Sequence, residues 1–184
     1  MPEDAPTTNT RRPVRGPAPA VTTLCRNVGR RRSRAPVWCT PVPVDVEELA
    51  DRVAISDLLT TYADALDRRD WTQYRSVFTA DAHIDYRSAG GKAGDVDTVA
   101  RWLEEVLGGF EMTQHLIANH QVTLDGDEAT VRAMFYNPMR ATGGGQFFCG
   151  GWYNHQLVRT ADGWRSRELI EESAWSEGFP NPAG

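Results

Sequence analysis

The period of the hydrophobic pattern changes along the chain, and this change most constrains the fold. Before Gly108-Gly109, apolar side chains recur every three to four positions, whereas after it they mostly alternate with polar ones. The first period is that of an amphipathic helix, and the second is that of a strand with one buried face. The order predicts an α+β fold in which N-terminal helices pack on a mostly antiparallel sheet.

Three stretches carry the helical pattern, namely residues 44–66, 71–78 and 97–107. Asp45 and Asp70 stand where N-cap residues are expected, because a short side-chain oxygen can accept a hydrogen bond from a free N–H of the first turn. We therefore predict three helices.

The first helix places a carboxylate beside its apolar stripe. Asp67 falls in its last turn, where the negative end of the helix dipole disfavours a carboxylate. Such violations are typical of functional sites, although a surface ion pair with Arg68 or another Lys or Arg is the commoner explanation for a single acid. Asp67 is therefore a candidate site residue. The stripe itself consists of Ile55, Leu58, Leu59, Tyr62 and Leu66.

Alternating residues predict the strands, with Tyr86 facing inward at the end of the first. Gly150-Gly151 interrupts a strand and indicates a bulge or bend, so we expect a strongly curved sheet. His115 and His120 leave opposite faces of one strand unless a bulge intervenes, so they do not predict a shared metal site. The predicted strands are residues 83–87, 113–124, 129–136, 146–160 and 164–170.

The two ends of the chain differ from its centre in composition. Residues 1–43 contain eight arginines against Glu3 and Asp4, which is a net charge of +6 in a chain of formal net charge −5. This Pro- and Arg-rich segment lacks apolar periodicity, so we predict a disordered basic tail, a single domain over residues 44–178 and a short tail over 179–184. A basic tail can bind nucleic acid, but the segment lacks interleaved aromatic residues, and we expect no nucleic-acid partner.

Cysteine use and hydropathy exclude several other classes of protein. Cys25, Cys39 and Cys149 are odd in number and widely spaced, so they predict neither a disulfide framework nor a metal site. No apolar run is long enough for a membrane span, and the start lacks the apolar centre of a signal peptide. We therefore expect a cytoplasmic protein without a membrane partner.

Five short blocks occur in one consistent order between about residues 45 and 178. Together they resemble the SnoaL-like branch of the nuclear transport factor two superfamily, and within it scytalone dehydratase and its bacterial relatives, including bile-acid dehydratases. The resemblance implies a cone-shaped roll that carries dehydratases, isomerases, cyclases and non-catalytic binders. The blocks are Tyr62-Ala63-Asp64-Ala65-Leu66-Asp67, Asp70-Trp71, Ile84-Asp85-Tyr86-Arg87-Ser88, Thr113-Gln114-His115 and Asp162-Gly163-Trp164.

The resemblance also assigns roles to individual residues. It implies that Asp67, Tyr86, His115 and Asn154 are dehydratase site residues, and that Tyr62 matches a tyrosine of bile-acid dehydratases. A second histidine and a second tyrosine of scytalone dehydratase are replaced here, so a substrate other than scytalone is expected. The replaced positions fall near Met139 and on Leu66.

The chemistry of these residues fits removal of water next to a carbonyl. His115, oriented by Asp67, would remove a proton and return it to the departing hydroxyl, while Tyr86 would donate to the enolate oxygen. The small hydrophobic substrate, a polycyclic or polyketide- or steroid-like hydroxy-ketone, would bind without a metal or other cofactor. Its expected contacts are Asn154, for a hydroxyl group, and Tyr62, Phe148 and Trp152, which would line an apolar pocket.

Three alternatives stay open at this stage. The same pocket could serve a ketosteroid-isomerase-like or polyketide-cyclase reaction on a polycyclic or polyketide- or steroid-like hydroxy-ketone. His115 and Asp67 could instead form a buried polar pair in a non-catalytic ligand-binding domain. Tyr86 could be a core aromatic residue, and Asn154 could bind a neighbouring backbone group. Because this fold exposes one sheet face, we also expect a homo-oligomer, either a dimer or a trimer.

Overall fold

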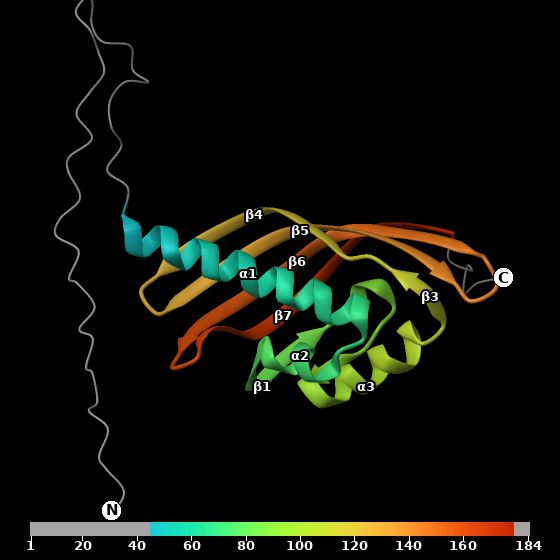
Figure 1. The fold of residues 1–184 in the computed structure, drawn as a ribbon, viewed down its shortest axis with the longest axis horizontal. Coiled ribbons are helices and arrows are strands. Elements are labelled where there is room, and N and C mark those ends of the chain that lie inside the picture. The colour runs from blue at the N-terminus through green and yellow to red at the C-terminus, as the bar shows by residue number, and fades with distance from the viewer. Residues whose placement is uncertain (1–44, 179–184) are drawn as a thin grey trace, which may run out of the picture. The chain divides into compact units, whose positions relative to one another are not determined.

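The computed structural model describes residues 45–178, which contain three α-helices, one short 3-10 helix and seven strands (Figure 1). The predictions for residues 1–43 and 179–184, including those for Cys25 and Cys39, lie outside this range. The elements are α1 (Val46–Arg68), α2 (Trp71–Ser76), β1 (Phe78–Asp85), η2 (Arg87–Ala89), β2 (Ala93–Asp95), α3 (Val96–Leu107), β3 (Phe110–Thr113), β4 (Leu116–Asp125), β5 (Glu128–Ala141), β6 (Gln146–Thr160) and β7 (Gly163–Glu177).

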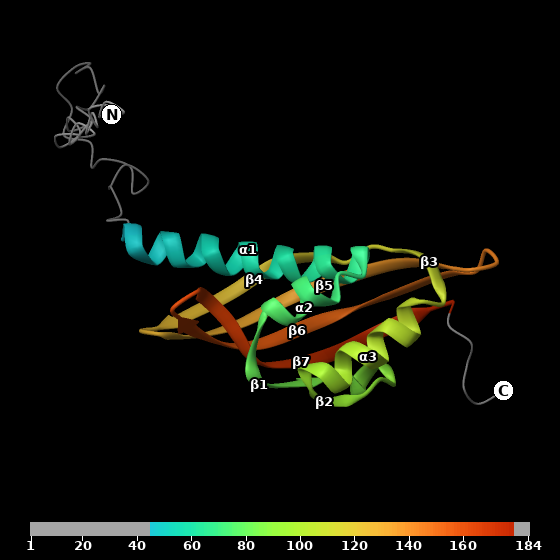
Figure 2. The same cartoon turned by 60° about the horizontal axis from the view of Figure 1, so that its bottom comes forward.

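The seven strands form one strongly curved sheet in the order β2-β1-β7-β6-β5-β3, with β4 also paired to β5. All neighbouring pairs are antiparallel except β1 and β7, which run parallel. The three α-helices lie on the same side of this sheet, as Figure 2 shows. The predicted α+β roll with a mostly antiparallel sheet is confirmed.

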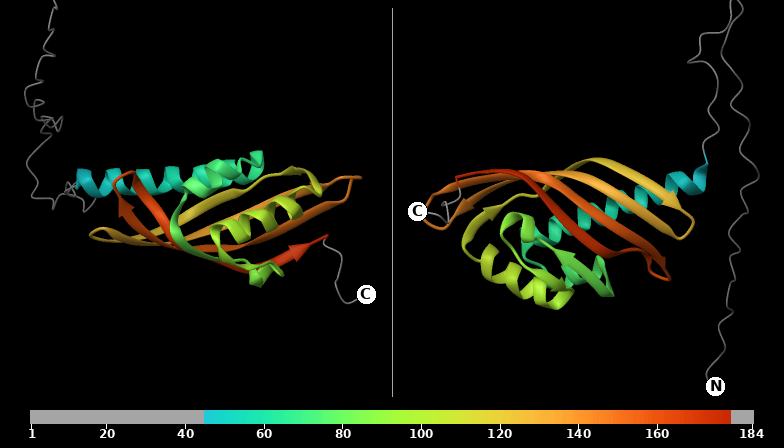
Figure 3. Two further views of the ribbon diagram at one scale, coloured as in Figure 1. Left: turned by 90° about the horizontal axis from the view of Figure 1, so that it is seen from below. Right: turned by 180° about the vertical axis from the view of Figure 1, so that it is seen from behind.

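The apolar stripe of the first helix forms the centre of the core. Ile55, Leu59 and Tyr62 are fully buried between α1 and the concave face of the sheet, whose curl is visible in Figure 3. Asp45 caps this helix by accepting hydrogen bonds from the N–H groups of its first turn, and Asp70 caps α2 in the same way. Both capping predictions are confirmed.

The order of β3 and β4 along β5 creates the position of His115. Both strands pair with β5, one after the other, and His115 lies in the gap between them. The O atom of Pro138 on β5 accepts the N–H of Gln114, whereas Pro138 itself has no N–H to offer. Because Gln114 directs its N–H to β5, the N–H of the next residue, His115, points away from β5 and binds a side chain instead.

A bulge in β4 changes which residues face the core. The pairing of β4 with β5 shifts between Ala118 and Gln121, and Asn119 adopts a positive φ of 51°. Strict alternation over the predicted strand 113–124 would place Leu116 on the same face as Val122, and this is wrong because the bulge adds a residue between them. Leu116 is 48% exposed, whereas Ile117, Val122 and Leu124 pack against the core.

Other boundaries differ from the prediction by a few residues. β1 begins at Phe78 and ends just before Tyr86, which still faces inward and is 4% exposed. α3 begins at Val96 with Asp95 as its cap, one residue before the predicted start. Within the described range, no helix combines the length and the apolar character needed to cross a bilayer.

Candidate functional site

Asp67 and His115 form a close polar pair between the end of α1 and the gap between β3 and β4. Oδ1 of Asp67 lies 2.6 Å from Nδ1 of His115, and Oδ2 accepts the backbone N–H of His115 at 2.9 Å. An ionised carboxylate can only accept hydrogen bonds, so Nδ1 of His115 carries the proton. Asp67 therefore orients the ring, and in the tautomer that it selects Nε2 is the nitrogen that can accept a proton.

Arg69 holds the end of α1 against the segment that precedes His115. It adopts a left-handed conformation with φ 58° and ends the helix. Its guanidinium group donates hydrogen bonds to the carbonyl oxygens of Leu107, at 3.0 Å, and Phe110, at 2.6 Å. These contacts join α1 to the start of β3, so they place Asp67 within reach of His115.

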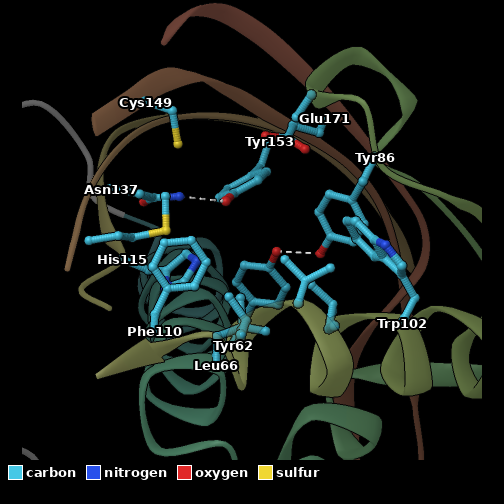
Figure 4. Close-up of a pocket in the computed structure, with 15 residues that line it drawn as sticks. Tyr62, Leu66, Tyr86, Trp102, Phe110, His115, Asn137, Cys149, Tyr153 and Glu171 are labelled. Atoms are coloured by element: carbon cyan, nitrogen blue, oxygen red, sulfur yellow. Dashed lines mark hydrogen bonds between the residues drawn. The ribbon is translucent and has the colours of Figure 1, made fainter. Parts of the chain in front are cut away.

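A cavity of about 140 Å³ opens beside this pair. Figure 4 shows His115 on one wall and Tyr86 and Glu171 on the opposite wall. Apolar residues such as Leu66, Trp102 and Phe110 line much of the remaining surface. The site is therefore a small, mostly apolar chamber with polar groups at two ends.

Two predicted tyrosines lie together in this cavity. The hydroxyl groups of Tyr62 and Tyr86 are hydrogen-bonded, 2.5 Å apart. Burial raises the pKa of both phenols well above the usual 10.0, so both stay protonated. Only one of the two hydroxyl protons is used between them, so the pair keeps one proton for a further acceptor.

Three residues predicted to bind substrate lie outside this cavity. Phe148, Trp152 and Asn154 share one face of β6, as predicted, but that face is the outer one. Phe148 stacks on Tyr136, Trp152 lies under the guanidinium group of Arg132, and Asn154 donates to the backbone oxygen of Ile170. Their predicted position in the pocket is wrong, because both faces of β6 carry aromatic residues and periodicity alone does not tell them apart.

Several cavity residues were missed by the sequence-based reasoning. Tyr153 and Cys149 come from the inner face of β6, and burial raises the pKa of the Cys149 thiol to about 12, so it stays protonated. Asn137 donates to the hydroxyl of Tyr153 at 3.1 Å, while its own buried Oδ1 has no partner among the described residues. The alternation of β5 continued past Tyr136 would have placed Asn137 inward.

Glu171 is the other missed residue, and it lies on the inner face of β7. It is 8% exposed and lines the cavity, and loss of solvent on burial raises the pKa of its carboxyl group to about 7. The predicted strand ended at residue 170 and therefore did not include Glu171. Continuing the alternation from buried Leu169 would have identified a carboxyl group on an inner face.

His155 is buried but does not line the cavity. Its Nδ1 lies 3.0 Å from Oγ of Ser166, and its ring contacts that of Tyr62 edge to face. Burial lowers the pKa of His155 to about 3, so the ring is neutral and acts in packing. Among residues 45–178, no group of three or more His, Cys, Asp or Glu side chains is arranged to hold a metal ion.

Comparisons with known proteins agree with this architecture. An uncharacterized protein of Mycobacterium tuberculosis is 40% identical over 136 residues, which cover 73% of this chain and 92% of that protein. The crystal structure of the Kfla4162 protein from Kribbella flavida is 31% identical, with a TM-score of 0.66 over 72% of this chain and 95% of that one.

A third comparison involves a structure from Novosphingobium aromaticivorans that is provisionally assigned as a scytalone dehydratase. It has a TM-score of 0.66 and 19% identity, covers 73% of this chain and 91% of that one, and shares the fold. The SnoaL-like domain family matches residues 47–170, which include both Asp67 and His115. This chain therefore belongs to the family of SnoaL-like domains, as its sequence blocks and its curved α+β roll indicate.

Proposed function

We propose that this protein is a lyase that removes water from a small hydroxy-ketone without a cofactor, with His115 and Asp67 as the acid–base pair. The observation that supports it best is the 2.6 Å contact between Asp67 and Nδ1 of His115. No described residue binds Nε2, the other ring nitrogen, and the ring lines the cavity. A base held in this way needs little reorganisation before it accepts a proton.

The proposed reaction has two steps. Nε2 of His115 removes a proton from the carbon next to the substrate carbonyl, and the electrons of that C–H bond form an enolate. The enolate then re-forms the carbonyl group and a new carbon–carbon double bond, while the bond to the hydroxyl group on the next carbon breaks. The protonated His115 returns its proton to that hydroxyl group, which leaves as water.

Tyr86 and Tyr62 would stabilise the enolate. Both phenols are neutral hydrogen-bond donors, and they face an apolar cavity in which a hydrogen bond to a negative oxygen is stronger than in water. Tyr86 would donate to the oxygen, and Tyr62 would donate to Tyr86.

Asn137 would take the role that the sequence suggested for Asn154. Its Oδ1 is buried and has no partner among residues 45–178, although it belongs to a residue that lines the cavity. An unpaired buried acceptor costs about 1–3 kcal/mol, and a substrate hydroxyl group would remove that cost. We therefore assign the hydroxyl contact to Asn137.

The substrate that we propose is a polyketide- or steroid-like hydroxy-ketone whose reacting ring enters the cavity. A volume of about 140 Å³ is close to that of an engineered protein cavity known to bind benzene. One ring would therefore fit inside, and further rings of a polycyclic substrate would extend beyond it.

Two other enzymatic reactions would use the same groups. A ketosteroid-isomerase-like reaction would return the proton to a different carbon, and a polyketide cyclase would let the enolate attack a second carbonyl. The imidazole of His115 on one wall and the neutral phenols on the opposite wall favour any reaction that passes through an enolate. A non-catalytic ligand-binding domain would form no enolate.

Incubation with 3-hydroxycyclohexanone in deuterated buffer separates these possibilities. A dehydratase forms 2-cyclohexenone, which is detected by mass and by its ultraviolet absorption. Deuterium uptake next to the carbonyl without loss of water would favour the isomerase or cyclase. His115→Ala is the control, and a wild-type rate equal to that of this variant in both assays would contradict an enzymatic function.

The outer face of the sheet supports the proposed homo-oligomer. Tyr136 and Trp175 are 42% and 46% exposed, and both pack against each other beside Phe148. An exposed aromatic cluster of this kind is typical of a protein–protein interface. Sedimentation of the wild type and of Trp175→Glu would distinguish a monomer from a dimer or trimer. The cytoplasmic location stays a prediction.

A further inference from the structure

Glu171 occupies a position in the cavity that the proposed acid–base chemistry does not use. It lies on β7 directly opposite Tyr153 of β6. On its other side, β1 and β7 run parallel with Asp85 paired to Ile170, so the next residues, Tyr86 and Glu171, are neighbours. The carboxyl group thus lies in a wall of phenols across the cavity from His115 (Figure 4).

A turn fixes this arrangement from outside. Oγ of Ser88 donates a hydrogen bond to the backbone oxygen of Glu171 at 2.8 Å and accepts the N–H of Ser173 at 3.0 Å. Ser88 belongs to η2, which follows Tyr86 directly. These two bonds join the turn that follows Tyr86 to the part of β7 that carries Glu171, as the second layer of contacts around a binding site requires.

The carboxyl group of Glu171 has no polar partner of its own. No described residue forms a hydrogen bond or an ion pair with it, and no Lys or Arg lines the cavity. Burying a charge without a partner is costly, which explains why its pKa rises to about 7. Below that pH the group is a neutral carboxylic acid with a proton to donate.

We propose that the protonated carboxyl group of Glu171 binds the carbonyl oxygen of the substrate directly, beside Tyr86, and thereby selects uncharged ketones over carboxylates. The chemical class of the ligand rests on the proposed function. A carbonyl oxygen accepts two hydrogen bonds, and Tyr86 and Glu171 are adjacent donors. A carboxylate ligand would instead bring a second negative charge toward an acid without a counterion.

Binding of a ketone should therefore require the proton on Glu171. The other titratable groups that face the cavity are Tyr62 from α1, Tyr86 after β1, His115 between β3 and β4, and Cys149 and Tyr153 from β6. Burial raises the pKa values of the phenols and the thiol, so they stay protonated near neutral pH. The variants must therefore distinguish an effect of Glu171 on binding from an effect of His115.

The test is the affinity for 2-cyclohexenone between pH 6 and pH 8, followed by NMR on the full chain. Because the protonated fraction of a group with a pKa of about 7 falls roughly tenfold over this range, the wild type should bind about tenfold more weakly at pH 8. Glu171→Gln keeps a donor without a proton to lose, so it should bind equally at both values. Glu171→Ala should bind weakly at both.

Glu172→Gln is the matched control, because Glu172 is the next residue but lies on the outer face in an ion pair with Arg132. It should keep the wild-type pH profile. A second probe, 1-cyclohexenecarboxylate, should bind more weakly than the ketone to the wild type. The assignment is overturned if Glu171→Gln retains the tenfold change, since His115 would then be responsible, or if the wild type shows none.

Failure of the proposed lyase reaction would be visible separately. If the protein binds 2-cyclohexenone with the expected pH dependence but forms no product from 3-hydroxycyclohexanone, the role of Glu171 in binding is supported and the lyase is not. Thermal unfolding of each variant at both pH values shows whether weak binding reflects loss of the fold.

Discussion

Asp67 contacts His115 twice, once at the ring and once at the backbone. Oδ1 lies 2.6 Å from Nδ1, and Oδ2 lies 2.9 Å from the backbone nitrogen. The two bonds fix both the position of the residue and the rotation of its ring, which a single bond would not do. They also remove the conflict between Asp67 and the helix dipole, because the carboxylate accepts two donors from outside the helix.

Asp67→Asn should lower kcat by about 10²- to 10⁴-fold with little loss of stability. The amide can keep an acceptor on the backbone N–H, but its NH₂ group then faces Nδ1 of His115 and requires that nitrogen to be unprotonated. The proton would move to Nε2, which could no longer act as a base. Steady-state kinetics with 3-hydroxycyclohexanone measures the effect.

Asp64→Asn is the control for this substitution, because Asp64 lies on the same helix and is exposed. It should leave kcat unchanged. His115→Ala should reduce kcat at least as much as Asp67→Asn. Near-normal turnover by either site variant, with the fold intact by circular dichroism, would contradict the acid–base pair.

Tyr86→Phe should lower kcat by about 10- to 10³-fold, because it removes the donor placed for the enolate oxygen. It also leaves the hydroxyl of Tyr62 without its observed partner, at a cost of about 1–3 kcal/mol in the free energy of unfolding. Tyr136→Phe, at an exposed position on the outer face, should change neither quantity. Steady-state kinetics and urea unfolding of both variants measure these effects. Equal kcat values for Tyr86→Phe and Tyr136→Phe would exclude Tyr86 as the donor to the enolate oxygen.

The sequence predicted the parts of the site that lie on strongly periodic elements. Tyr62 follows from the helical stripe and Tyr86 from strand alternation, while the partner of Asp67 came from the resemblance to a family. The contact between α1 and His115 depends on the gap between β3 and β4, which propensity does not predict. Pro138 was visible in the sequence, but its effect on the ladder requires knowledge of which strand lies beside it.

Faces of strands were harder to predict than the strands themselves. β6 has aromatic residues on both faces, because Phe148 and Trp152 cover the outside while Tyr153 fills the core. The bulge at Asn119 had no clear signal, since asparagine tolerates positive φ but does not require it. A bulge, or a strand with aromatic residues on both faces, can reverse which side chains are assigned to the core. The predicted strand itself stays correct.

Glu171→Gln should stabilise the protein above neutral pH. The folded pKa of about 7 exceeds the ordinary 4.5, so the folded state binds more protons between these values and its stability falls as pH rises through them. At pH 8 the variant should gain at most about 3 kcal/mol in the free energy of unfolding, and near pH 4 almost nothing. Urea unfolding at both values measures this, and an equal change at both would show that Glu171 is not destabilised by its charge.

Arg69→Ala should lower kcat several-fold although Arg69 does not line the cavity. Its guanidinium group holds the carbonyl oxygens of Leu107 and Phe110, so its loss should loosen the end of α1 and the geometry of the pair at Asp67. Arg69→Gly removes the same contacts but accepts the φ of 58° more readily, so it should be more stable than Arg69→Ala by about 1 kcal/mol.

The two Arg69 variants separate positioning from backbone strain. If the guanidinium contacts position Asp67, both should lose the same factor in kcat despite their different stabilities, and the KM should change less than kcat. Arg68→Ala is the control, because Arg68 is the exposed neighbouring residue. Normal kcat in Arg69→Gly, measured well below its unfolding temperature, would show that the contacts stabilise the fold without orienting Asp67 toward His115.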